Sequence, residues 1–173
     1  MSTPESEARL ALEAFPTTWR RIMTDPHGFF ADMPETGGLG QPFGFLAICA
    51  AVNAAGHLLV GGGVRGLVVA LVGQLIGAVL VAALFVLVAQ HLFEGRGGFE
   101  STFRVVAYAA APLVVLWVPV LGVLAWLYRA YLMLRGVERV QGLDTTRALL
   151  TVLVGLGALG VLGAVRPGGP LWF

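Results

Sequence analysis

Residues 105–134 read VVAYAAAPLVVLWVPVLGVLAWLYRAYLML, an apolar stretch of thirty residues with one charge, Arg129, and two prolines, Pro112 and Pro119. As a single straight helix, this stretch would be roughly 45 Å long at about 1.5 Å per residue. The hydrocarbon core of a bilayer is only about 30 Å thick. Pro119 removes a backbone donor and strains the helical turn before it. We therefore predict that the chain turns back at Pro119 and crosses the membrane twice here; one long, strongly tilted span is the alternative.

The composition of the whole chain is that of a membrane protein. Of its 173 residues, 57% are hydrophobic and 12% are charged, whereas soluble domains carry about 25% charged residues. All eleven basic residues are arginine, which fits a GC-rich coding bias and a bacterial source. A single cysteine, Cys49, and three scattered histidines predict no disulfide, metal site or cofactor. The net charge of +1 and the lack of a basic face argue against a nucleic-acid partner.

These features predict an all-α polytopic membrane protein: five transmembrane helices in a single bundle, with an N-terminal amphipathic helix at the membrane interface. No signal peptide is expected, because charged residues occur within the first nine positions and no suitable apolar segment follows. The predicted parts are a disordered N-terminus (residues 1–9), an amphipathic cytoplasmic segment (10–34), a five-span domain (42–165) and a short external tail (166–173). Within the five-span domain, the predicted spans are residues 42–60, 67–92, 102–118, 119–134 and 145–165. Two charged loops are predicted at residues 93–104 and 136–147.

Residues 10–34 carry the pattern of an amphipathic helix followed by a second helix start. Their apolar side chains recur at helical spacing: Leu12, Phe15, Trp19, Ile22 and Met23. Arg20 and Arg21 lie beside this run, and Pro16 interrupts it. Asp25 is a suitable N-cap and Pro26 a suitable first helical residue. Such a segment is typical of a helix lying in the membrane interface; packing of the same face on the protein's own bundle is the alternative.

The arginines determine the predicted orientation. With five spans, nine of them fall on one side: Arg9, Arg20, Arg21, Arg96, Arg104, Arg129, Arg135, Arg139 and Arg147. The other side carries two, Arg65 and Arg166, whereas four spans would divide the arginines six against five. Because arginine-rich flanks stay cytoplasmic, we predict a bacterial inner-membrane protein with a cytoplasmic N-terminus and an external C-terminus. Arg104 and Arg129 are expected to snorkel toward a membrane surface.

Three segments carry a recognisable pattern: WRRIMTDPHGFF (residues 19–30), GGFESTFRVVAYAAAP (97–112), and the run from Trp126 through GLDTTRA (142–148) into the last span. The most specific pattern, Phe-Arg-x-x-x-Tyr-x-x-x-Pro, begins at Phe103. Together these segments resemble the Yip family of Ypt/Rab GTPase-interacting membrane proteins, in its bacterial branch. The resemblance implies five spans, a cytoplasmic N-terminus and no catalytic site. Eukaryotic members are linked to Rab GTPases and membrane traffic, a role that does not carry over because this sequence lacks their long N-terminal cytosolic region.

Polar and helix-breaking residues inside the spans are the first group of candidates, because such groups are costly in a bilayer and often mark function. They are Asn53, His57, Gln74, Tyr108, Pro112 and Pro119. Asn53 and His57 share a helical face, as do Tyr108 and Pro112. Two interpretations are open. In the first, these residues line a polar crevice between helices. In the second, they only join helices through hydrogen bonds worth about 0.6 kcal/mol on average. Pro112 frees a backbone carbonyl, for which we expect a polar side chain from another span as partner.

The cytoplasmic surface supplies the second group: Trp19, Arg20, Arg21, Asp25, Pro26, Arg96, Arg104, Arg135, Arg139 and Arg147. Arginines near an anionic headgroup surface contribute about 1 kcal/mol each, and a protein partner would use the same surface. Gly73 and Gly77 form a small-residue face that serves packing within the chain or a homo-oligomer. Asp144 is a candidate cap for the last span.

The sequence contains no nucleophile–base set and no phosphate-binding loop. We therefore predict a non-enzymatic protein without cofactors, which acts through lipid and protein contacts of its cytoplasmic arginine-rich surface. The alternative is a small transporter, channel or lipid-moving protein that uses the intramembrane polar residues between proline-broken helices.

Overall fold

The computed structural model describes residues 4–164, and these are almost entirely helical. In chain order the elements are α1 (Pro4–Thr24), α2 (Pro26–Asp32), α3 (Gly40–Leu59), α4 (Gly63–Phe93), α5 (Phe99–Tyr108), the 3₁₀ helix η1 (Ala111–Val115), α6 (Pro119–Gln141) and α7 (Thr145–Ala164). No strand occurs among the described residues. The predicted all-α class is confirmed, whereas the predicted external tail lies outside the described residues.

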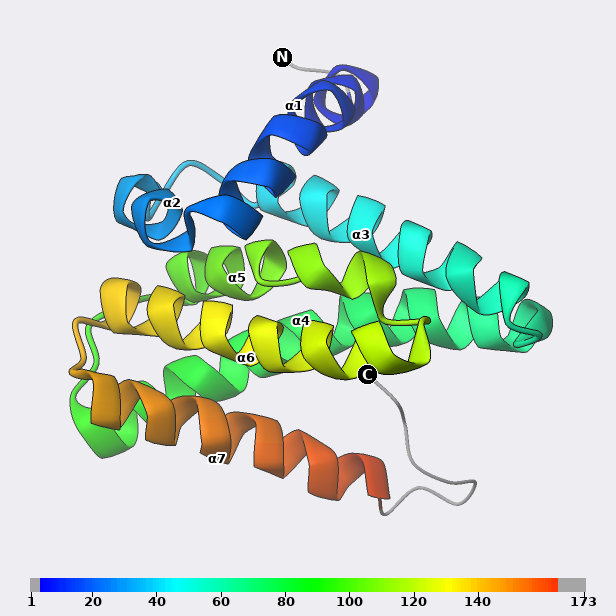
Figure 1. Ribbon diagram of the computed structural model, residues 1–173. Helices are drawn as coiled ribbons and strands as arrows, with labels where there is room; N and C mark the ends of the chain where they lie inside the picture. Colours follow the sequence, from blue (N-terminus) through cyan, green and yellow to red (C-terminus); the bar gives the residue numbers. More distant parts are fainter. Residues whose placement is uncertain (1–3, 165–173) are drawn as a thin grey trace.

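The bundle consists of α3, α4, α5 with η1, α6 and α7, which lie side by side and run alternately in opposite directions (Figure 1). One end of this bundle, which we call the loop end, carries the α4–α5 connection (94–98) and the α6–α7 connection (142–144). The opposite end, which we call the hairpin end, carries the tight α3–α4 turn (60–62). Helices α1 and α2 lie across one side of the bundle, toward its loop end (Figure 1).

The segment formed by α5 and η1 is the centre of the bundle. Every residue from 101 to 113 is buried, and α5 contacts α3, α4 and α6. A helix in such a position has no face toward lipid or water, so it carries apolar or small residues on all sides. The run Ala109, Ala110 and Ala111 meets this need, because small side chains let the surrounding helices approach closely.

The stretch 105–134 reverses direction, as predicted, at Pro119. Val118 has an extended backbone with ψ 118°, and Pro119 then occupies the first turn of α6. A Cβ atom at Gly122 would lie 2.4 Å from the Leu116 carbonyl oxygen, so the close approach after the turn requires glycine. The indole N–H of Trp117 donates to the Val114 carbonyl at 3.0 Å and closes the turn. One continuous helix through this stretch is therefore excluded.

Both charged connections are shorter than the sequence predicts. α5 begins at Phe99, inside the predicted loop 93–104, and α6 continues to Gln141, inside the predicted loop 136–147. Charged residues mark where a helix leaves the hydrocarbon core, but the helix itself continues into the headgroup region and beyond. The predicted fourth span, 119–134, accordingly covers only part of α6.

Two further expectations about the backbone are wrong. α5 ends at Tyr108 while Pro112 lies in η1, so these two residues do not share a face of one continuous helix. Pro112 causes this break because it lacks an N–H and disfavours the helical conformation in the residue before it. Pro16 lies inside α1 without ending it. α1 begins at Pro4, and proline suits the first turn of a helix. The predicted disorder of residues 1–9 stays a prediction.

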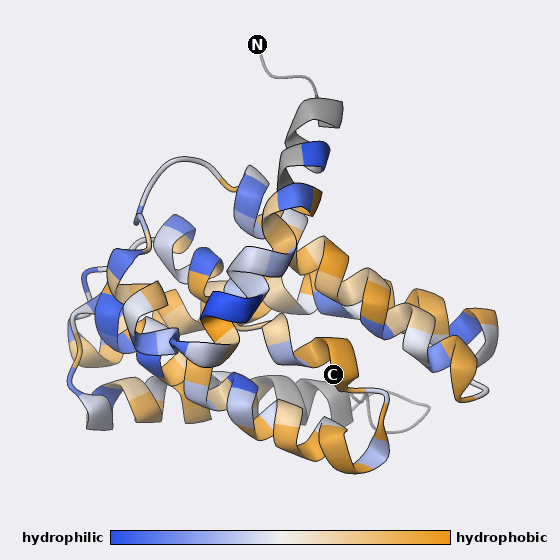
Figure 2. Ribbon diagram, turned by 45° about the horizontal axis from the view of Figure 1, so that its top comes forward, coloured by the Kyte–Doolittle hydropathy of each residue, from blue (hydrophilic) through white to orange (hydrophobic). Residues whose placement is uncertain are grey.

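The bundle has the hydropathy of a membrane domain. Three helices are long and apolar enough to cross a bilayer, namely α3, α4 and α6, and Thr145–Ala158 of α7 forms a shorter apolar helix. The outward faces expose large hydrophobic side chains such as Val72, Ile76 and Leu124. Figure 2 shows apolar residues along the length of the bundle and hydrophilic residues gathered at the loop end. Such outward faces suit lipid tails, because a helix bonds its backbone groups internally.

Candidate functional site

The second half of α1, together with α2, packs on the bundle. Ile22, Phe30 and Met33 are buried in the core. The Phe15 ring lies 5.0 Å from the Phe45 ring of α3, and α2 contacts α6. The sequence left two arrangements open for residues 10–34, a helix in the membrane interface or packing on the bundle. The second half of α1 and α2 pack on the bundle. Whether the segment also lies at a membrane surface stays a prediction.

Two long-range hydrogen bonds fix α1 over the broken centre of the bundle. The indole N–H of Trp19 donates to the Ala111 carbonyl at 2.8 Å. The Tyr128 hydroxyl of α6 donates to the Met23 carbonyl at 3.2 Å. Ala111 opens the 3₁₀ turn that contains Pro112, so Trp19 is turned toward the bundle interior and supplies a donor to a carbonyl at this break. The carbonyl that Pro112 leaves without its helical donor is that of Tyr108, four residues earlier, so the expected partner from another span stays a prediction.

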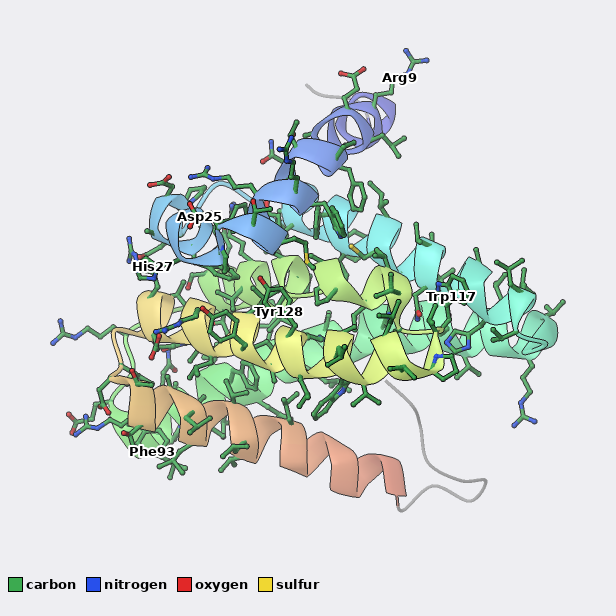
Figure 3. The ribbon with its side chains drawn as sticks, in the orientation of Figure 1. Arg9, Asp25, His27, Phe93, Trp117 and Tyr128 are labelled. Atoms are coloured by element: carbon green, nitrogen blue, oxygen red, sulfur yellow. The ribbon has the colours of Figure 1, made fainter. Side chains whose placement is uncertain are left out.

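The first half of α1 leaves the bundle. Leu12 continues the apolar stripe of Phe15, Trp19 and Ile22 by one turn, yet its side chain is 59% exposed. Figure 1 shows this half projecting away from the bundle. Figure 3 places Arg9 near the tip, away from all other helices. A stripe that is buried at one end and exposed at the other is incomplete without a further apolar surface.

The α1–α2 junction follows its local sequence signals. The Gly28 N–H donates to Asp25 Oδ1 at 3.0 Å, and Pro26 lies in the first turn of α2. A Cβ atom at Gly28 would lie 2.2 Å from Asp25 Oδ2, so only glycine fits beneath this cap. The predicted cap is confirmed, and the predicted cap at Asp144 is confirmed too, since Asp144 Oδ2 accepts from the Thr146 N–H at 3.2 Å.

Most arginines near the loop end are paired with acids. The ion pairs are Arg21 with Asp32, Arg104 with Glu100 at 3.2 Å, Arg135 with Glu138 at 3.1 Å, Arg139 with Glu35 at 3.0 Å, and Arg147 with Asp144 at 3.2 Å. All ten acidic residues of the chain lie in α1, α2 or the segments around the loop end. Arg20 and Arg96 are exposed and make no ion pair with any residue that the structure describes. The local positive charge is therefore much smaller than a count of arginines indicates.

Arg104 holds the connection into α3 rather than snorkelling to a surface. Its guanidinium is buried and donates to the Gly38 carbonyl at 2.6 Å and to Glu100 at 3.2 Å. Glu100 in turn accepts from the Gly38 N–H at 2.7 Å. The snorkelling prediction is wrong here, because an acid one turn before Arg104 and a nearby carbonyl supply its partners inside the protein.

Gln141 joins the two connections of the loop end. Its Oε1 accepts from the Gly97 N–H at 3.0 Å, and its Nε2 donates to the Thr102 hydroxyl at 2.8 Å. The Arg96 N–H donates to its carbonyl at 3.1 Å. A buried amide with all these partners rigidifies the structure around it. Sequence reasoning missed Gln141, because a glutamine at the end of a helix carries no local sign of a tertiary role.

The intramembrane candidates lie mostly inside the bundle. Asn53 of α3 and Gln74 of α4 are only 2% and 6% exposed, and Tyr108 of α5 is also buried. Tyr108 is surrounded by aromatic rings, with the Phe29 ring at 5.0 Å and the Phe45 ring at 5.3 Å. The remaining three are divided: Pro112 is buried, His57 half-buried, and Pro119 exposed at the turn into α6. The structure therefore does not gather all six residues into one crevice.

Comparison with known proteins supplies the family. The Yip1 domain matches residues 20–166. The chain belongs to the Yip1-domain family. No curated protein and no solved structure matches it. As a Yip1-domain protein with three long apolar helices, it is a transmembrane, multi-pass protein. The matched region begins in the last turns of α1, so the projecting first half of that helix lies outside it.

Arg129 of this Yip1-domain protein differs most from its predicted position, which was at a membrane surface. Its side chain is 8% exposed, at the middle of α6, so it does not reach a membrane surface by snorkelling. The set of arginines predicted to lie on the cytoplasmic side loses this member, which leaves eight against two. Among the described residues no hydrogen bond or ion pair to its guanidinium is present, and its Nε is buried without a partner. Groups of His, Cys, Asp or Glu able to hold a metal ion are likewise absent from the described part of the chain.

Proposed function

We propose that this Yip1-domain protein is non-enzymatic and acts through contacts of its loop end and α1 with membrane lipids or a protein partner. The projecting half of α1 carries the proposal, because its apolar stripe continues past the bundle to Leu12, which is 59% exposed. A helix that projects from the bundle and is apolar on one face is suited to the membrane interface. Arg9 and Arg20 flank this stripe and would meet anionic headgroups.

The proposed topology has five crossings, formed by α3, α4, α5 with η1, α6 and α7, with the loop end in the cytoplasm. The alternating directions of these segments support it (Figure 1). The arginine distribution supports the orientation, because only Arg65 and Arg166 fall on the other side. We place the protein in a bacterial inner membrane on the basis of its lysine-free composition.

A depth measurement tests the interfacial position of α1. In a Cys49→Ala background, Leu12→Cys and Glu13→Cys are each labelled with an environment-sensitive fluorophore, and the protein is placed in lipid nanodiscs. Both positions are exposed, but they lie about 100° apart around the helix. We expect blue-shifted emission and quenching by lipid-borne quenchers at position 12, and water-like emission at position 13. Water-like emission at both positions would refute the interfacial α1.

A second experiment tests the loop end. Arg20→Glu with Arg96→Glu removes two exposed arginines without opposing any ion pair in the described structure. We expect weaker co-purification of anionic lipid or of a protein partner than with the matched control Arg65→Glu, at the hairpin end. Equal retention by all variants would remove the loop end from the proposal.

Transport or lipid movement is the second candidate, favoured by one observation. Asn53, Gln74 and Tyr108 all lie inside the bundle and not toward lipid. Polar groups between broken helices often mark a substrate path. The test is the rate at which fluorescent lipids cross liposomes that contain the protein. We expect Gln74→Leu to slow this rate if the path exists; a rate equal to that of protein-free liposomes would eliminate this candidate.

A further inference from the structure

The apolar outward faces of α4 and α6 differ greatly in length. On α4, residues 66–89 carry no charge, and their one polar side chain, that of Gln74, is buried. These are about 24 residues, which rise roughly 36 Å at about 1.5 Å per residue. That is more than enough to cross a hydrocarbon core of about 30 Å. We call the outward side chains of this part the long flank; they include Val72, Ile76 and Leu87.

The corresponding face of α6 is short. It begins after the turn at Pro119 and ends before Arg135, and the one charged side chain between them, that of Arg129, is buried. Residues 120–134 are about 15 residues and rise roughly 22 Å, whereas a span needs at least about 17 residues. We call the outward side chains of this part the short flank; they include Val123, Leu124 and Leu127.

Contacts at both ends of α6 fix this difference in height. The Trp117 ring occupies the space that a Cβ atom at Gly56 would need, about one turn before α3 ends at Leu59. The turn into α6 therefore stops short of the tip of the α3–α4 hairpin, as Figure 1 shows. Toward the loop end, the Tyr128 hydroxyl bonds to the Met23 carbonyl and α2 contacts α6. The α1–α2 segment therefore covers part of α6 below the short flank.

A flat bilayer of about 30 Å does not match both flanks. Tilting a helix lowers its height, so a tilt adapts the long flank but increases the mismatch of the short flank. A span that is too short is accommodated by a thinner bilayer or by association with another protein. Helix association in a bilayer ordinarily uses small residues, whereas the short flank exposes large side chains such as Leu124 and Trp126. Lipid is therefore the occupant that suits this surface.

We propose that the short flank binds a locally thinned bilayer and that the lipids which fit it have short acyl chains. The long flank, on the same bundle, suits longer chains, so the protein would select different lipids on its two sides. This proposal rests on the proposed five crossings, and not on the proposed lipid contacts of the loop end and α1.

Lipid quenching at one position on each flank tests the proposal. In a Cys49→Ala background, Leu124→Cys on the short flank and Ile76→Cys on the long flank each carry a fluorophore; the replaced side chains are 58% and 56% exposed. The full-length protein is placed in vesicles of short-chain and long-chain phosphatidylcholine in equal parts, with bromine on the acyl chains of one lipid at a time. The ratio of quenching by the short-chain lipid to quenching by the long-chain lipid is measured at each position. We expect the ratio at position 124 to exceed that at position 76 at least about threefold.

A longer apolar face on α6 supplies a second variant. Arg135→Leu with Glu138→Leu removes both members of one ion pair and extends the uncharged outward face to residue 138, a rise of roughly 28 Å. The ratio at position 124 should then fall to that at position 76. The control, Arg96→Leu, removes an exposed arginine at the loop end and should keep the original ratio. The comparison of positions 124 and 76 stands even where the double variant does not fold.

Equal ratios at positions 124 and 76 would overturn the proposal, as would an unchanged ratio at position 124 in a folded double variant. If position 76 is quenched but neither lipid quenches position 124, then protein covers the short flank, for instance a second copy of the chain, and the proposal is wrong. Absent quenching at position 76 would instead refute the proposed crossing by α4, and this proposal with it.

Discussion

At the scale of residues, Trp19 has a role that its position in an amphipathic helix does not reveal. Its indole N–H donates to the Ala111 carbonyl at the helix break, over a sequence separation of 92 residues. An indole at that spacing is ordinarily interpreted as interfacial, because tryptophan favours the headgroup region. Here the break at Pro112 supplies a carbonyl at the centre of the fold, and Trp19 reaches it from outside the five-segment bundle. The bond thereby couples the N-terminal segment to the core.

Replacing Trp19 tests this bond. Trp19→Phe retains an aromatic ring but leaves the Ala111 carbonyl without its indole donor, so we expect a loss of about 1 kcal/mol in the free energy of unfolding. The measurement is denaturant unfolding in detergent micelles. Trp126→Phe is the matched control, because Trp126 is partly exposed on α6 and makes no hydrogen bond within the described structure. A loss no greater than that of the control would contradict the role given to Trp19.

Gln141 gives a second prediction at this scale. Gln141→Leu leaves the Gly97 N–H and the Thr102 hydroxyl without their partner, so the loop end should open more readily. We expect hydrogen exchange at the Gly97 amide to accelerate about tenfold, equivalent to roughly 1.4 kcal/mol. Gln41→Leu, at the exposed start of α3, should leave this rate unchanged. An unchanged rate in Gln141→Leu would show that the two connections are held independently.

At the scale of elements, the central position of α5 depends on close contact with α6. A Cβ atom at Gly136 would lie 2.2 Å from Val105 Cγ1, so the two helices approach through this glycine. Gly136→Ala should therefore cost about 1–3 kcal/mol of stability as overpacking. Adding Val105→Ala should restore part of the loss, because the two residues share one contact. Gly157→Ala, where nothing lies within 4 Å, should instead be neutral or stabilising by up to about 1 kcal/mol through helix propensity.

The elements that the sequence predicts correctly are those with local signals. The Asp25 and Asp144 caps and the reversal at Pro119 follow from residue types within a few positions, and the structure contains all three. Helix ends at Gln141 and Phe99 were missed, because charge was used to mark them and helices continue past the membrane surface. The interior position of Arg129 and the Trp19 hydrogen bond depend on which helices are neighbours in the bundle. The hydrophobic periodicity of a single sequence does not determine these neighbours.

At the scale of the whole molecule, the arginine distribution supports the proposed orientation more strongly than it supports lipid binding by the loop end. The arginine bias supports the orientation, because acids contribute little to that rule. Binding to anionic lipid depends on the total field, and the ion pairs formed by Arg21, Arg135, Arg139 and their neighbours reduce it. The projecting half of α1 is therefore the stronger candidate for a lipid contact, and the paired arginines are better explained as holding the loop end together.

The central claim, five crossings with the loop end in the cytoplasm, is tested most directly by cysteine accessibility in intact cells. In a Cys49→Ala background, single cysteines replace Val64 and Val120 at the hairpin end, and Gly98 and Thr145 at the loop end. All four positions are exposed in the structure, so folding should tolerate the changes. We predict that a membrane-impermeant thiol reagent labels positions 64 and 120 from outside, and labels 98 and 145 only after the cells are opened. External labelling at position 98 or 145, or its absence at 120, would contradict the account.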